Sequence, residues 1–120
     1  FLDEACRQPD PLADDQAVYC QTTKGLVVIL GCAHAGVVNT LLHIERLARA
    51  RRIHAVVGGM HLLHASPGRL AATVDALRSR DIGLLCPAHC TGLAAVVCLC
   101  QNFPGRCIAA GVGSRFVFGG

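Results

Sequence analysis

The 120-residue sequence has no tryptophan, one tyrosine and four phenylalanines, so it offers few aromatic side chains on which nucleic-acid bases could stack. Charged residues make up only 16% of it, and the formal net charge of +3 comes without a basic stripe. Nucleic-acid-binding proteins usually combine a basic surface with stacking aromatic side chains. We therefore expect no nucleic-acid partner.

The sequence also lacks a long hydrophobic run. Its longest apolar stretch, Leu93 to Cys100, is far shorter than the roughly 20 residues that cross a bilayer. No charged-then-apolar leader is visible at its start. These features predict a cytoplasmic protein that does not interact with membranes.

Hydrophobic residues are abundant, at 52%, which excludes a disordered tail and is enough for one folded core. Eight cysteines could form a disulfide framework. Most of them lie among aliphatic residues, however, where a free cysteine behaves as a small buried hydrophobe. We therefore expect reduced thiols at Cys20, Cys32, Cys86, Cys98, Cys100 and Cys107.

Residues 1–15 are polar and contain Pro9 and Pro11, which indicates an N-terminal segment or linker before a domain at 16–120. Apolar runs and helical periodicity then alternate along that domain. Such alternation predicts an α/β fold with one mixed sheet and helices on one face. The expected strands are 17–22, 26–30, 53–57, 82–85, 106–110 and 115–118, and the expected helices are 37–51, one that begins at 66–67, and 92–101.

Three histidines, His34, His61 and His89, each follow an expected buried strand by a few residues. The carboxyl ends of parallel strands open onto one crevice, so the three imidazoles can converge there. Neutral imidazole is a good ligand for zinc, iron and related metals. The alternative is that each histidine only stabilises its own loop. His64 lies near the same crevice and is a candidate substrate contact, or else a solvated side chain.

Five short motifs carry a resemblance to a known family. They are Asp14-Asp15-Gln16, Lys24-Gly25-Leu26-Val27-Val28-Ile29, Gly31-Cys32-Ala33-His34-Ala35-Gly36, Gly58-Gly59-Met60-His61-Leu62 and His89-Cys90-Thr91-Gly92. In this order they resemble the metallo-β-lactamase-fold hydrolases, and within them the dihydropterin ribofuranosyl-aminobenzene-phosphate synthase-like branch. The resemblance covers roughly residues 12 to 118.

The resemblance implies an αββα sandwich of two sheet-plus-helix halves, of which this chain would be the C-terminal half. It implies that His34 and His89 are metal ligands, with His61 a ligand or a catalytic contact. The His-x-His-x-Asp-His motif, which supplies most of the metal ligands in this family, does not occur in the sequence. We therefore expect zinc, or another divalent transition metal, to be held weakly by this chain alone.

The function expected on this basis is metal-dependent hydrolysis of an ester or phosphoester. The substrate would be a small molecule, and it could carry a phosphate group. Thr91 and Gly92, at the start of the last expected helix, could hold an anionic group, or Thr91 could simply cap that helix. Whether the chain is itself an enzyme stays open at this point.

Two other interpretations remain. A half sandwich would leave one sheet face apolar and bare, so the chain would self-associate or pair with the missing N-terminal half, and it could be a non-catalytic interaction module. Alternatively, cysteines and His89 could form a structural zinc or redox site. The candidates for that site are Cys86, Cys90, Cys98 and Cys100, while Cys32 and Cys90 could be reactive thiols or packing residues.

Overall fold

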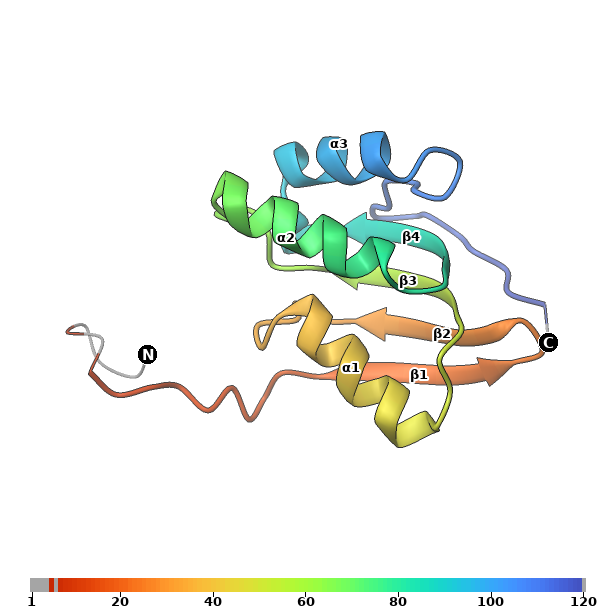
Figure 1. Ribbon diagram of the computed structural model, residues 1–120, viewed down its shortest axis with the longest axis horizontal. Coiled ribbons are helices and arrows are strands. Elements are labelled where there is room, and N and C mark those ends of the chain that lie inside the picture. Colours follow the sequence, from red (N-terminus) through yellow and green to blue (C-terminus); the bar gives the residue numbers. More distant parts are fainter. Residues whose placement is uncertain (1–4, 6, 120) are drawn as a thin grey trace.

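The computed structural model describes residue 5 and residues 7–119, which form one four-stranded mixed sheet with three helices (Figure 1). The strands stand in the sheet in chain order; β1 is antiparallel to β2, whereas β2, β3 and β4 are parallel. This confirms the α/β class with a mixed sheet. The elements are β1 (Ala17–Thr22), β2 (Gly25–Leu30), α1 (Val37–Ala48), β3 (Ile53–Gly59), α2 (Pro67–Arg78), β4 (Ile82–Ala88), the 3-10 turn η1 (His89–Thr91) and α3 (Leu93–Asn102).

The core lies between the sheet and the helices, which cover the same face of it (Figure 1). Alternate residues of β2, namely Leu26, Val28 and Leu30, point into this layer and are almost fully buried. They meet the apolar stripe of α1, represented by Leu41, which has no exposed surface. Burying such aliphatic side chains contributes about 1.5–3 kcal/mol each, so this layer is the main source of stability.

The opposite face of the sheet is partly bare. Val18 of β1 and Ile29 of β2 are cross-strand neighbours, and 59% and 48% of their surfaces are exposed. Ile29 alternates with the core residues of β2, which places it on the face away from the helices. Apolar surface is therefore exposed where the sequence predicts a face without cover. Within the described residues, no helix is both long and apolar enough to cross a membrane.

The prediction of two C-terminal strands is wrong. Residues 106–110 run beside β4 and exchange backbone hydrogen bonds with Leu85 and Pro87, but they make an isolated parallel bridge, between Leu85 and Cys107, rather than a strand. Residues 115–118 form no strand. Phe118 instead lies edge-on to His54, with ring centroids 5.6 Å apart. The turn at residues 111–114 separates the two stretches.

The first helix is also shorter than predicted. It ends at Ala48 because Arg49 adopts a left-handed conformation, with φ of 51°, and its N–H turns back to the carbonyls of Arg46 and Glu45. A residue in this conformation commonly ends a helix. The expected extension to residue 51 therefore becomes the connection to β3.

Candidate metal site at the ends of the parallel strands

Three loops follow the carboxyl ends of β2, β3 and β4, and they meet at one edge of the sheet. The parallel register places Leu30 beside Gly58 and Gly58 beside Pro87, so the strands end level with one another. His34, His61 and His89 belong to these three loops, as the sequence predicts. Side chains at this edge of a parallel sheet are well placed to share a ligand.

His34 and His61 are in contact. Their ring centroids are 4.6 Å apart and the rings meet edge to face. Both residues are exposed, so their nitrogen atoms are accessible to solvent and to a ligand. The structure thus brings together two of the three histidines singled out from the sequence.

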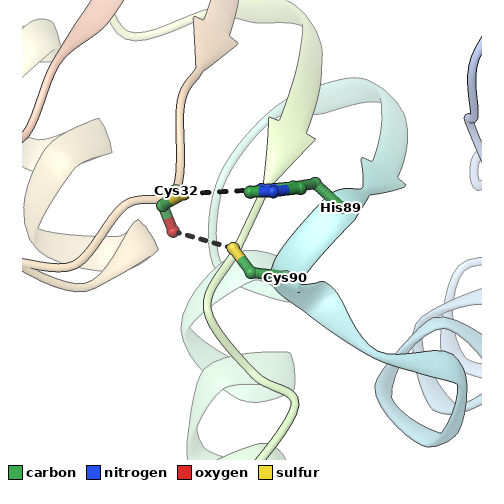
Figure 2. Close-up of side chains that lie close together, drawn as sticks. All are labelled: Cys32, His89 and Cys90. Carbon is green, nitrogen blue, oxygen red and sulfur yellow. Dashed lines mark hydrogen bonds between the residues drawn. The ribbon is translucent and has the colours of Figure 1, made fainter.

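His89 lies in a second cluster, formed with two cysteines (Figure 2). The Sγ of Cys32 is 3.4 Å from Nδ1 of His89, and the thiol of Cys90 donates a hydrogen bond to the carbonyl oxygen of Cys32 at 3.4 Å. One ligand atom from each of the three residues lies within 4.8 Å of the others. Within the described part of the chain, His34 and His61 do not belong to this cluster.

Gly59 allows the cysteine cluster to form. Its N–H donates to the carbonyl of Gly31 at 3.1 Å, which draws the loop after β2 onto the end of β3. A Cβ atom at this position would lie 2.5 Å from that carbonyl oxygen and 2.7 Å from Sγ of Cys90. Only glycine fits between the two loops, so Gly59 sets how closely Cys32 and Cys90 approach.

Thr91 is fully buried and joins two strand ends. Its hydroxyl accepts a hydrogen bond from the Met60 N–H at 3.1 Å and donates one to the carbonyl of Ala88 at 2.6 Å. The helix-cap interpretation of Thr91 is wrong, because Gly92 occupies the N-cap position of α3 and no side chain caps it. In this structure Thr91 positions the loops after β3 and β4, and Gly92 packs tightly against Leu63.

The backbone is strained at this edge. Ala33, His61 and His89 have positive φ angles of 54°, 50° and 50°, one in each of the three loops. Non-glycine residues rarely adopt this left-handed conformation, although histidine does so more often than most. Such strain persists only where the surrounding structure enforces it, and it is common at functional sites.

Burial raises the pKa of the Cys32 thiol above its ordinary value, and its hydrogen bond with Cys90 and the charges of Cys90 and Asp15 raise it further. The carboxylate of Asp15 lies nearby because it accepts a hydrogen bond from the Ala35 N–H at 2.9 Å. The thiol is therefore protonated when no cation is bound. A bound dication would reverse this preference, because it stabilises the thiolate directly.

A cavity of about 320 Å³ adjoins the cluster. It is lined by Cys90 and His61, by His64, and by Arg69 in the first turn of α2. Ser66 caps this helix by accepting a hydrogen bond from the Arg69 N–H at 3.2 Å. Two imidazoles and a guanidinium thus line one cavity, and His64 lies near the crevice, as the sequence analysis expects. Its remaining lining residues are Leu63 and Ala65.

Sequence reasoning named Cys90 with His89 as candidates for a zinc site but did not bring Cys32 to them. Each cysteine stands within two residues of a candidate histidine, which was the available signal, but they are far apart in the chain. Their proximity depends on the register of β2, β3 and β4 and on the missing side chain of Gly59.

Comparisons with known proteins agree with this architecture. The chain is 31% identical over 94 residues to 7,8-dihydropterin-6-methyl-4-(beta-D-ribofuranosyl)-aminobenzene-5'-phosphate synthase of Methanocaldococcus jannaschii, a match that covers 78% of this chain and 32% of the relative. It is 35% identical over 95 residues to an uncharacterized protein of the same organism, covering 79% of this chain and 34% of that protein. The chain spans about a third of the length of these curated relatives.

A solved structure resembles most of the fold described above. It is the crystal structure of Tm1679, a metal-dependent hydrolase of the β-lactamase superfamily, with a TM-score of 0.81 and 35% sequence identity. The similarity covers 87% of this chain and 40% of that protein. No family model matches the chain.

Proposed function

Because this chain is related in sequence and fold to metal-dependent hydrolases of the β-lactamase superfamily, we propose that it forms the C-terminal half of the active site of such an enzyme. The observation that carries the proposal is the meeting of Cys32, His89 and Cys90 at the edge of the sheet where the parallel strands end. The reaction is hydrolysis of an ester or phosphoester, and the chain acts in the cytoplasm.

The donor atoms of the cluster suit a borderline-soft divalent metal. Thiolate sulfur and imidazole nitrogen are the ligands that zinc prefers, and neighbouring ligand atoms around one tetrahedral zinc lie roughly 3.3–3.8 Å apart. Three donor atoms within 4.8 Å of one another are compatible with one ion. Three ligands leave a coordination position open, which is typical of catalytic rather than structural zinc sites.

The chemistry that such a metal supplies is a lowered pKa of bound water and polarisation of the substrate oxygen. The residues of this chain would bind the metal and exchange protons with the substrate. His89 would hold the metal together with Cys32 and Cys90. His34 would add a further ligand only if its loop moved toward this cluster, which it does not join in the structure, and His61 would be a ligand or the group that exchanges a proton with the substrate. His61 suits the second task because it is exposed and lines the same cavity as Cys90.

Cobalt binding tests this proposal directly. Titration of the reduced chain with Co²⁺ should give one equivalent of binding and a near-ultraviolet thiolate-to-cobalt absorption band, because Cys32 and Cys90 supply sulfur ligands. We expect the ion to be removed by mild chelation. Cys98→Ser, on α3, should leave the band unchanged, whereas Cys90→Ser should remove most of it. A chain that binds no cobalt would contradict the proposal.

The basic cavity indicates an anionic substrate group, and a phosphorylated small molecule fits this requirement. Arg69 and His64 can donate charge-assisted hydrogen bonds to the oxygens of a phosphate in this cavity. The assigned roles of Thr91 and Gly92 are then indirect, because Thr91 holds the backbone of Met60, next to His61, and Gly92 packs against Leu63, which lines this cavity.

Replacing Arg69 with glutamine should weaken the binding of phenyl phosphate about 10-fold, since one charge-assisted hydrogen bond contributes about 1.5–3 kcal/mol. NMR titration of the histidine ring signals would measure the dissociation constant. Arg46→Gln, which removes the same charge from the exposed side of α1, is the matched control and should change little. An equal loss of phenyl phosphate affinity in both variants would show that binding depends only on the net charge of the protein and not on Arg69.

A second candidate role is that of a non-catalytic half-fold that binds a partner. The exposed pair Val18 and Ile29 favours it, because apolar side chains on a bare sheet face gain by being covered. The partner would be a second copy of the chain or an N-terminal half. This role is the one that remains if the chain binds no metal.

A further inference from the structure

A second pair of cysteines lies outside the candidate site, at the opposite end of α3 from Gly92. The Sγ atoms of Cys100 and Cys107 are 3.2 Å apart, and the Cys100 thiol also lies 3.8 Å from the carbonyl oxygen of Cys107. Both residues are half-buried. The two thiols therefore face each other across the turn that follows the helix.

The backbone holds both cysteines in place. The helix ends on Phe103, whose side chain is only 2% exposed and whose N–H donates to the carbonyl of Leu99 at 2.9 Å. The Arg106 N–H then donates to the carbonyl of Phe103 at 3.0 Å, which closes the turn. Cys107 itself forms the isolated bridge with Leu85 of β4. The approach of the two thiols is thus set by buried and hydrogen-bonded backbone.

We propose that Cys100 and Cys107 are a reversible redox pair that closes to a disulfide. Sulfur atoms in a disulfide are about 2.05 Å apart, so closure requires an approach of roughly 1 Å, which small side-chain rotations supply. The bond joins α3 to the segment beside β4. It is independent of the metal site.

The oxidant is a low-molecular-weight disulfide such as oxidised glutathione. The Cys100 thiol loses its proton and attacks one sulfur of the small disulfide, which releases one small thiol and leaves a mixed disulfide. Cys107 then loses its proton and attacks the Cys100 sulfur, and the second small thiol leaves. The protein gives up two hydrogen atoms, and the small disulfide takes them up as two thiols.

The environment of Cys107 decides the order of these steps. Burial, together with the hydrogen bond and charge of Cys100 and the charge of Cys86, raises the pKa of its thiol to about 12. Cys107 is therefore protonated in the reduced protein, which leaves Cys100 to react first with the oxidant. Cys107 then attacks the Cys100 sulfur because the mixed disulfide forms directly beside it.

Peptide mapping tests the pair. Trypsin cleaves after Arg80, Arg106 and Arg115, so Cys100 and Cys107 fall in different peptides. After exposure of the chain to oxidised glutathione, with a chelator present, these two peptides should be found joined. The oxidised protein should melt about 5–10 °C above the reduced one, because the bond constrains the unfolded chain.

Matched variants identify the partner of Cys107. Cys98→Ser changes a neighbouring half-buried thiol on the same helix and should leave both the joined peptides and the rise in melting temperature intact. Cys100→Ser and, independently, Cys107→Ser should lose both. The proposal is overturned if Cys107 joins another cysteine, or if glutathione stays on Cys100 as a mixed disulfide in the folded protein.

Discussion

Replacing His89 with alanine is expected to weaken the binding of Zn²⁺ by this chain about 100-fold or more. Loss of a residue that merely orients a metal ligand typically weakens metal binding about 10–100-fold, so the loss of one of three ligands should cost at least as much. His89 contributes the single imidazole of the cluster, next to the Cys32 sulfur at 3.4 Å. Competition with a chromophoric chelator would measure the dissociation constants.

Two controls separate loss of a ligand from loss of structure. His89 has a φ of 50°, a conformation that asparagine tolerates better than alanine, so His89→Asn removes the imidazole with less strain on the backbone. His43→Ala changes an exposed histidine on α1 and should leave zinc affinity unchanged. If His89→Asn binds zinc as tightly as the original chain while folding normally, His89 is not a ligand.

Replacing Thr91 with valine is expected to lower the free energy of unfolding by about 2–5 kcal/mol. The change preserves the shape of the side chain but leaves both the N–H of Met60 and the carbonyl of Ala88 without the partner that the hydroxyl provides. An unsatisfied buried polar group costs about 1–3 kcal/mol, and Thr91 has no exposed surface through which water could replace the hydroxyl. Urea denaturation followed by circular dichroism would measure the change.

The comparison with other threonine substitutions makes this result specific. Thr91→Ser retains the hydroxyl and should recover most of the stability. Thr40→Val removes a half-buried hydroxyl that bonds only to the carbonyl of Gly36 within its own helix, so it should cost much less. If Thr91→Val and Thr40→Val are equally mild, the hydroxyl of Thr91 does not hold the two strand ends together.

Local sequence patterns predict most of the architecture because they reflect burial. The apolar run of β2 is buried at Leu26, Val28 and Leu30, and the Ser66-Pro67 signal marks the start of α2 as expected. The C-terminal strands were predicted wrongly because Phe116 and Phe118 look like strand residues. Their rings instead stack on each other, and the Phe118 ring also contacts His54, which no local pattern reveals.

The candidate site is less predictable because it depends on contacts between distant parts of the chain. The positions of His34, His61 and His89 follow from the parallel topology, and the structure confirms that each lies just after its strand. Which side chains touch is decided by finer detail. Gly59 brings Cys32 to Cys90, and the hydroxyl of Thr91 is turned inward rather than toward a helix end.

The left-handed residues at the three loop corners have a consequence for how such a sequence can change over time. Ala33, His61 and His89 stand where backbone energetics alone would choose glycine or asparagine, since a left-handed residue with a Cβ atom costs about 1–2 kcal/mol. If the proposed role of His61 and His89 were no longer needed, replacing both histidines with such residues would therefore raise the free energy of unfolding. Retaining histidine at positions 61 and 89 therefore lowers the stability of the fold by a small amount.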